Sequence, residues 1–142
     1  MRVLIVESRY HENVADALVD GATSALEKGG AQFERIAVPG ALEIAPAIAL
    51  AAGSRRFDGY LGLGCVIQSG SYHFEMIATQ STHGLMRLGI EQKLCIGNGL
   101  LACADEDEAL RLADFFRGDA GGEAARACLS LMQWRTRLEL GL

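Results

Sequence analysis

The chain opens on an uninterrupted apolar run, Val3-Leu4-Ile5-Val6, framed by Arg2 on one side and Glu7 on the other. A strand with one solvated face would alternate apolar and polar residues, and this run does not. The pattern therefore predicts a strand that is buried on both faces, as in the interior of a parallel sheet. Such a strand needs helices on both faces of its sheet, which restricts the fold to the α/β class.

The rest of the sequence alternates short apolar runs with segments of helical periodicity. We expect strands over residues 2–8, 32–38, 58–67 and 93–97. We expect helices over residues 13–28, 42–52, 72–88, 105–116 and 123–138. Strands joined by helices form parallel sheets with helices packed on both faces. The prediction is an α/β fold with one domain over residues 1–142, a single three-layer α/β/α sandwich with a four-stranded parallel sheet.

Composition excludes several classes of function. The net charge is -5 and no dense run of Lys or Arg occurs, so neither nucleic acid nor a membrane surface is expected as a partner. The sequence contains no P-loop, dinucleotide fingerprint, zinc-protease helix or serine-hydrolase elbow. The four cysteines form no CxxC pair, so we expect buried thiols, no metal site and a cytoplasmic protein. They are Cys65, Cys95, Cys103 and Cys128.

Ligands of such sheets bind beyond the carboxyl ends of the strands, so the loops at that edge are the first candidates for a site. Gly70-Ser71 follows the third predicted strand and offers a hydroxyl and free amides at a helix start, which suits a small anion. His73 comes two residues later and is suited to carry a proton beside a bound phosphate. A serine that only caps the helix and a surface histidine fit the same spacing, and on local pattern alone they are commoner.

Two other segments at this edge carry candidate ligand contacts. Glu43 follows Pro39-Gly40-Ala41-Leu42, and its carboxylate can accept hydrogen bonds from the N–H groups of a heterocycle or can merely complement a helix dipole. Tyr10 can stack on a flat ring or pack against a neighbouring loop or subunit. His11 and His83 show no pattern that indicates a functional role.

Taken in order, these segments resemble the lumazine synthase family across nearly the whole chain. The matching stretches are Val38-Pro39-Gly40-Ala41-Leu42-Glu43-Ile44, Leu63-Gly64-Cys65-Val66-Ile67, His73-Phe74-Glu75 and Gly121-Gly122-Glu123-Ala124-Ala125. One short motif would carry little weight, whereas this ordered set at matching separations is specific. The resemblance implies a transferase of riboflavin biosynthesis. It condenses 5-amino-6-(D-ribitylamino)uracil with 3,4-dihydroxy-2-butanone 4-phosphate to 6,7-dimethyl-8-ribityllumazine, releases phosphate and water, and needs no metal or organic cofactor.

The resemblance also implies a role for each edge segment. Tyr10 matches the aromatic residue that stacks on the pyrimidine ring, and His73 matches the catalytic histidine. Gly70 and Ser71 match the turn that binds the phosphate. The hydrogen-bonding and backbone contacts to the substrate match Ala41, Leu42, Glu43, Cys65, Val66 and Ile67.

The chain departs from the family pattern where the phosphate should be held. The family's phosphate-binding arginine falls on Leu112 in a gapless alignment, and two lysines common downstream fall on Phe116 and Ala120. Asn98 stands where the family usually has an aromatic contact residue. An unpaired phosphate dianion is costly, and arginine is the side chain best suited to hold it. Arg9 and a side chain of a neighbouring subunit are the two candidates to replace the arginine.

Three functions compete at this point. The first is an active synthase with a rearranged phosphate site, and the second is a lumazine- or flavin-binding protein of the same fold with little turnover. The third is a generic α/β ligand-binding domain. Retention of His73 favours the synthase, since a binding protein needs no proton carrier there. The resemblance further implies a homo-oligomer with shared sites, which we expect to be a free pentamer or a pair of pentamers.

Overall fold

The computed structural model describes residues 1–141, so Leu142, the last residue of the expected domain, lies outside the described part. Four parallel strands form one sheet in the order β2-β1-β3-β4. The strands are β1 (Arg2–Ser8), β2 (Gln32–Val38), β3 (Gly59–Ile67) and β4 (Ile96–Cys103). The helices are α1 (Glu12–Lys28), a 3₁₀ turn η1 (Ala41–Glu43), α2 (Ile44–Ala52), α3 (Tyr72–Glu91), α4 (Glu106–Ala113) and α5 (Ala120–Glu139).

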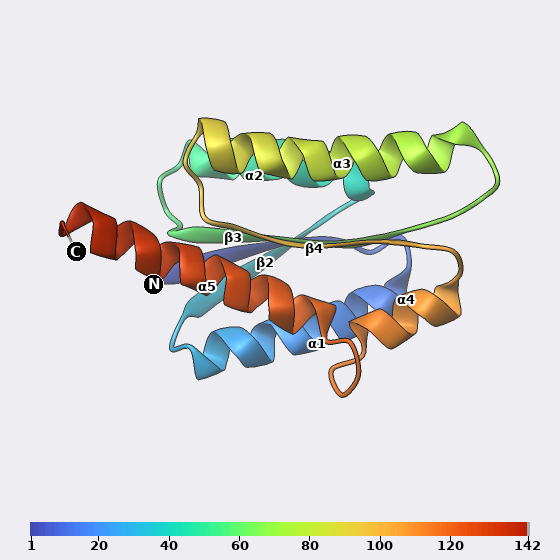
Figure 1. Cartoon of the computed structure of the whole chain (residues 1–142), viewed down its shortest axis with the longest axis horizontal. Helices are drawn as coiled ribbons and strands as arrows, with labels where there is room; N and C mark the ends of the chain where they lie inside the picture. The colour runs from blue at the N-terminus through green and yellow to red at the C-terminus, as the bar shows by residue number, and fades with distance from the viewer. Residues whose placement is uncertain (142) are drawn as a thin grey trace.

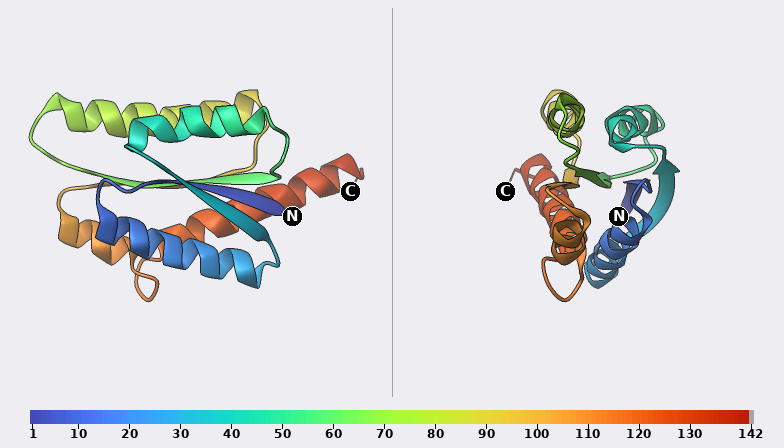
Figure 2. Two further views of the ribbon diagram at one scale, coloured as in Figure 1. Left: turned by 180° about the vertical axis from the view of Figure 1, so that it is seen from behind. Right: turned by 90° about the vertical axis from the view of Figure 1, so that its right-hand side faces the viewer.

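The helices cover both faces of the sheet, which confirms the predicted three-layer α/β/α sandwich. Helices α2 and α3 lie over one face, and α1, α4 and α5 lie over the other (Figure 1). The end-on view in Figure 2 separates the three layers. None of the helices in the described part of the chain is long and apolar enough to cross a membrane.

The opening apolar run explains why β1 lies inside the sheet. Val3 and Ile5 are fully buried against the layer of α1, α4 and α5, whereas Leu4 and Val6 are buried on the α2 and α3 side. Successive side chains of a strand point to opposite faces, so a strand that contributes to two cores must be apolar at every position. The run thus contributes to both cores, as its sequence predicts.

The fourth strand was placed incorrectly from sequence. It was expected over 93–97 but begins at Ile96 and runs to Cys103. Gly97 and Gly99, which suggested the end of a strand, lie within it because α5 packs directly on the sheet there. A Cβ added at Gly97 would lie 2.0 Å from the carbonyl oxygen of Ala124. Helix α5 begins at Ala120 and includes Gly121-Gly122. There it packs closely on α1, since a Cβ added at Gly121 would lie 1.9 Å from the carbonyl oxygen of Leu18.

Candidate functional site

A pocket of about 370 Å³ opens at the carboxyl edge of the sheet, between the end of β1, the turn η1, the end of β3 and the first turns of α3. Eight of the residues predicted as ligand contacts line it. They are Tyr10, Ala41, Leu42, Glu43, Cys65, Val66, Ile67 and His73. Segments that are far apart in sequence thus meet where parallel-sheet ligands bind.

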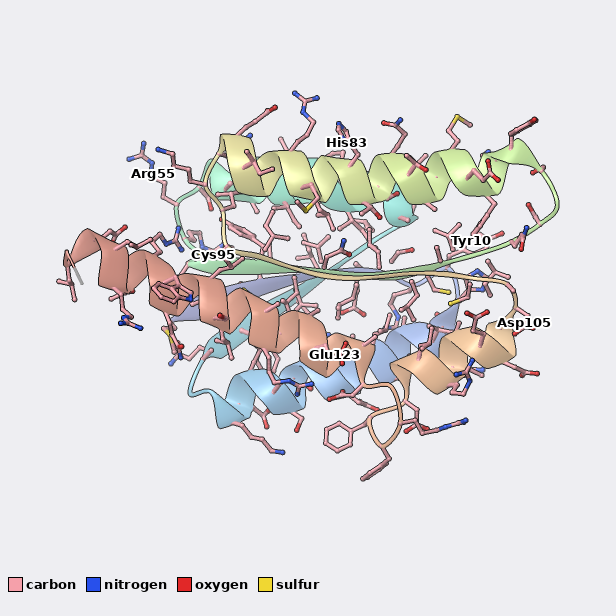
Figure 3. All side chains as sticks on the ribbon, in the orientation of Figure 1. Tyr10, Arg55, His83, Cys95, Asp105 and Glu123 are labelled. Carbon is pink, nitrogen blue, oxygen red and sulfur yellow. The ribbon has the colours of Figure 1, made fainter. Side chains whose placement is uncertain are left out.

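The side chains in this pocket differ in how firmly they are held. Tyr10 is 78% exposed and labelled in Figure 3 at the end of the molecule where α4 begins. Glu43 lies in η1, and its Oε1 atom is close to Gly40: a Cβ added at Gly40 would lie 3.3 Å from it.

Burial raises the pKa of the Cys65 thiol in this pocket to about 12. That thiol therefore stays protonated near neutral pH and is not a nucleophile.

The phosphate turn predicted at Gly70-Ser71 lies beside the pocket, between two residues that line it, Ser69 and His73. Gly70 has a φ of +79°, a left-handed conformation that favours glycine. Ser71 is the N-cap residue of α3, yet its side chain makes no capping hydrogen bond. Its hydroxyl lies 3.3 Å from that of Ser69 instead. The purely capping role that the sequence left open is therefore not what the structure shows.

Four predicted contact residues do not line the pocket of their own chain: Gly70 and Ser71, which lie beside it, and Asn98 and Leu112. Asn98 lies in the middle of β4 opposite Gly62, and its side-chain oxygen accepts a 2.9 Å hydrogen bond from the backbone N–H of Leu100. Leu112, on α4, packs against the core on the face of the sheet that α1, α4 and α5 cover. Both stay predictions that require a contribution from another subunit.

Sequence reasoning missed one titratable residue of the pocket, His11. The helix expected from Asn13 begins at Glu12, so His11 is its N-cap residue and reaches the pocket wall. The ring of His11 packs edge-on against that of Tyr10, with centroids 5.0 Å apart. The sequence feature that could have identified His11 as a pocket residue is its position directly after Tyr10. The other lining residues that sequence did not single out are Ser8, Gly40, Ser69, Phe74 and Ile77.

Arg9, one of the two candidates to hold phosphate, is already occupied. One of its nitrogens donates a 2.5 Å hydrogen bond to Glu7, and another donates to Asp16 on α1. The hydrogen bonds that Arg9 donates to Asp16 and Glu7 raise the pKa of its guanidinium. Two of the five N–H donors of Arg9 therefore serve a local network, and Arg9 stays a prediction as the phosphate-binding residue.

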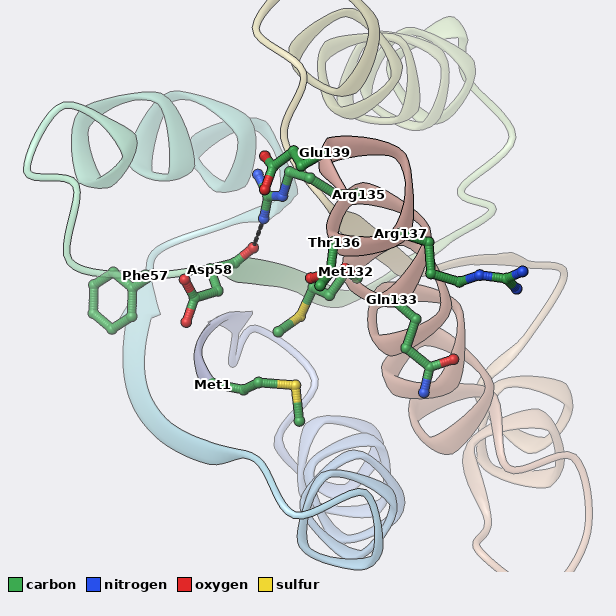
Figure 4. A pocket seen from close by; sticks show the side chains of 9 residues that line it. All are labelled: Met1, Phe57, Asp58, Met132, Gln133, Arg135, Thr136, Arg137 and Glu139. Atoms are coloured by element: carbon green, nitrogen blue, oxygen red, sulfur yellow. Dashed lines mark hydrogen bonds between the residues drawn. The ribbon is translucent and has the colours of Figure 1, made fainter. Parts of the chain in front are cut away.

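A second, larger hollow of about 710 Å³ lies at the opposite edge, where the strands begin. Figure 4 shows its lining from Met1, from Phe57 and Asp58 before β3, and from the carboxyl-terminal part of α5. Arg135 reaches across it and donates to the backbone carbonyl of Asp58. None of the predicted ligand contacts lines this hollow, and the carboxyl-edge pocket remains the candidate site.

The fold and this pocket define an α/β protein with a candidate ligand site at the carboxyl edge of a parallel sheet. Comparison with known proteins makes this specific, because the model of the 6,7-dimethyl-8-ribityllumazine synthase family matches residues 1–136. A 6,7-dimethyl-8-ribityllumazine synthase of Sphingopyxis alaskensis is 47% identical over 98% of both chains. A protein of the same name from Xanthobacter autotrophicus is 48% identical over 97% of this chain and 87% of its own length. The chain belongs to the 6,7-dimethyl-8-ribityllumazine synthase family.

Proposed function

We propose that the chain is an active transferase that forms 6,7-dimethyl-8-ribityllumazine in riboflavin biosynthesis. The substrates are the ribitylamino-pyrimidinedione and the four-carbon keto-phosphate, and the products include phosphate and water. The observation that carries the proposal is the family match over residues 1–136, together with the gathering of His73, Glu43 and Tyr10 in one pocket.

The pocket divides between a ring side and a phosphate side in this proposal. Tyr10 stacks on the pyrimidine ring, and the Glu43 carboxylate accepts hydrogen bonds from ring N–H groups. Backbone and apolar contacts come from Ala41, Leu42, Cys65, Val66 and Ile67. The phosphate lies near Gly70-Ser71 at the start of α3, where free amides and the helix dipole favour an anion. His73, in the first turn of α3, transfers protons during condensation and ring closure.

The outer face of α3 supports self-association. Four large apolar side chains are exposed on it: Tyr72 at 87%, Met76 at 56%, Met86 at 56% and Ile90 at 70%. At about 100° per residue they lie within an arc of about 80°, so they form one stripe along the helix. Exposed Thr79 and His83 share this arc, so the stripe consists of two apolar patches, one toward each end of the helix. Exposed apolar patches can mark an interface. We propose that other copies of the chain cover it in a pentamer, where a neighbour completes the pocket with its Asn98 and Leu112 regions.

The four cysteines are all free and buried. Free thiols are typical of a reducing compartment, which supports the proposal of a cytoplasmic enzyme.

Incubation with both substrates tests the function directly. Lumazine absorbance and phosphate release are followed together, and both should rise with equal stoichiometry. A protein that binds lumazine tightly but releases no phosphate from the substrate pair would be the ring-binding alternative, and the synthase proposal would then be wrong.

A further inference from the structure

We propose that Arg9 is a positioning residue that holds Tyr10 ready for ring binding, because its side chain links strand β1 to helix α1. The inference rests on the proposed function, since it explains how the stacking ring of that reaction is kept in place. The loop between the two elements is short, because β1 ends at Ser8 and α1 begins at Glu12. Its residues are Arg9, Tyr10 and His11. Any interaction that fixes this loop therefore also fixes the two loop residues that line the pocket.

The ring of Tyr10 has little packing of its own. It is 78% exposed at the carboxyl edge of the sheet (Figure 3). Its aromatic contact within the described part of the chain is the ring of His11, which belongs to the same loop. A contact inside one loop cannot hold that loop relative to the rest of the pocket. An aromatic side chain that becomes ordered only when the ligand arrives loses conformational entropy, which weakens binding. The position of Tyr10 therefore depends on how the loop is held.

The Arg9 side chain joins the elements on either side of this loop. One terminal nitrogen donates a 2.5 Å hydrogen bond to Glu7 on β1, and the other donates to Asp16 on α1. The Glu7 carboxylate is 2% exposed and also accepts two hydrogen bonds from Arg35 on β2. The sheet end of the link is therefore firmly held. Both bonds join charged groups, which makes them stronger than neutral hydrogen bonds.

The link constrains Tyr10 because Arg9 directly precedes it in the chain. The Arg9 side chain is turned toward α1, while Tyr10 lines the pocket. Fixing the Arg9 side chain thus fixes the backbone from which the Tyr10 ring extends. A site gains affinity when its contact residues are held in the bound position before the ligand arrives. In this role Arg9 acts on the ring side of the pocket and touches no substrate.

The test breaks the link at its exposed end, where the risk to folding is smallest. The Asp16 side chain is 63% exposed, and alanine is a good helix former, so Asp16→Ala should leave the fold intact. Asp16→Glu keeps an acceptor for Arg9. Asp20→Ala makes the same change one turn further along α1, at an exposed position, and is the matched control.

Three measurements are made on each variant. Calorimetry with the pyrimidinedione measures ring binding without turnover, steady-state kinetics give kcat and the KM for each substrate, and light scattering follows assembly. Asp16→Ala is also combined with Tyr10→Ala in a double-mutant cycle. If the link acts through Tyr10, its loss has no further effect once the ring is absent. A general loss of stability would not show this dependence.

We expect Asp16→Ala to weaken pyrimidinedione binding by about threefold to tenfold, because the loop then spends part of its time away from the binding position. KM for the pyrimidinedione should rise by a similar factor, while kcat and KM for the keto-phosphate change less than about twofold. Asp16→Glu and Asp20→Ala should match wild type. In the Tyr10→Ala protein, Asp16→Ala should change nothing further.

Several results would overturn the assignment. They are unchanged affinity in Asp16→Ala, a loss that Asp16→Glu shares, an equal loss with and without the Tyr10 ring, and a loss that accompanies a smaller mass in light scattering. A raised KM for the keto-phosphate alone would also overturn it and would point to Arg9 as a phosphate ligand. Pyrimidinedione binding that depends on Asp16 through Tyr10, in a protein that forms no lumazine, would overturn only the synthase proposal.

Discussion

The guanidinium of Arg35 donates two hydrogen bonds, of 2.8 and 3.0 Å, to the carboxylate of Glu7. Glu7 is the sixth residue of β1 and Arg35 lies on the neighbouring edge strand β2. Arg9 donates to the same carboxylate from the loop that follows β1. One buried acid thus ties the edge strand and the loop that carries Tyr10 and His11 to the centre of the sheet.

Replacement of Glu7 by glutamine should destabilise the protein by about 3 kcal/mol, since it leaves the arginines without their buried partner. Glu34→Gln is the matched control, because Glu34 pairs with Arg2 and Arg56 at an exposed position. Surface pairs of that kind contribute about 0–1 kcal/mol. Urea denaturation at pH 7 measures both variants, and equal losses would contradict a special role for Glu7.

The effect of Glu7 should also depend on pH. Burial raises the pKa of Glu7, but hydrogen bonds from Arg35 and Arg9 outweigh it and hold the pKa below its ordinary value. A carboxyl group with a lowered pKa stabilises the fold above its unfolded pKa of about 4.3, and this contribution disappears as pH falls through the lowered value. The difference in unfolding free energy between wild type and Glu7→Gln should therefore be full at pH 7 and shrink in acid. Urea denaturation at pH 7 and in acid measures this difference in unfolding free energy. The same difference at both would disprove the linkage to the Glu7 carboxyl.

The sequence predicts the class of fold well because the apolar run of β1 must be covered on both faces. It predicts the bounds of β4 poorly for an equally physical reason. Glycine is typical of loops, but in β4 it marks the place where α5 approaches the sheet, and that approach depends on residues more than twenty positions away. Local pattern cannot distinguish the two uses of glycine.

Gly97→Ala tests this explanation. The added methyl group would meet the Leu61 side chain, which can move, and the backbone of Ala124, which cannot move without shifting α5. We therefore expect a loss of about 3 kcal/mol or a failure to fold. Gly89→Ala, within α3, is the control, since the nearest neighbour of its Cβ would be the carbonyl oxygen of Leu94 at 3.7 Å, an ordinary contact. That variant should gain about 0.5–1 kcal/mol from helix propensity. Thermal unfolding of the pair checks the prediction, and a harmless Gly97→Ala would refute the close packing.

His73→Ala should slow lumazine formation by about 10²–10⁴-fold if the histidine transfers protons in the limiting step. The exposed position of His73 on α3 means that stability should hardly change. Binding of the pyrimidinedione should also persist, because ring contacts come from other side chains. Single-turnover kinetics at saturating substrate measure the chemical step, and a nearly unchanged rate would remove His73 from the mechanism.

The site shows a similar limit of prediction from sequence. Tyr10, Glu43 and His73 could be selected because each follows a predicted strand at the ligand edge. His11 could not, since the expected start of α1 lay one residue too late and gave it no defined position. Leu112 came from alignment alone, whereas Asn98 also lies in a segment expected at the ligand edge. Neither lines the pocket, and both stay predictions that depend on the proposed assembly.

Glu43→Gln should weaken binding of the pyrimidinedione more than binding of the keto-phosphate. The carboxylate can accept two N–H bonds from the ring, whereas the amide offers one acceptor and turns a donor toward the other N–H. Each charge-assisted bond contributes about 1.5–3 kcal/mol, so the loss should be at least tenfold in affinity. Glu75→Gln, in the first turn of α3 outside the pocket lining, is the control. Calorimetry that finds equal affinity for wild type and Glu43→Gln would contradict the assignment.

Assembly gives the last prediction, since we propose that a neighbour completes the pocket and covers the apolar side chains on α3. Ile90→Asp places a charge on the 70% exposed end of that stripe, and burying it against another copy would be costly. Asn13→Asp adds the same charge at an exposed polar position on α1 and serves as the control. Light scattering should give the mass of a pentamer, or of two, for wild type and control. Ile90→Asp should give a smaller mass and lose activity together with assembly. A monomeric wild type would refute the shared site, and a shell-sized mass would refute only the preference for small assemblies.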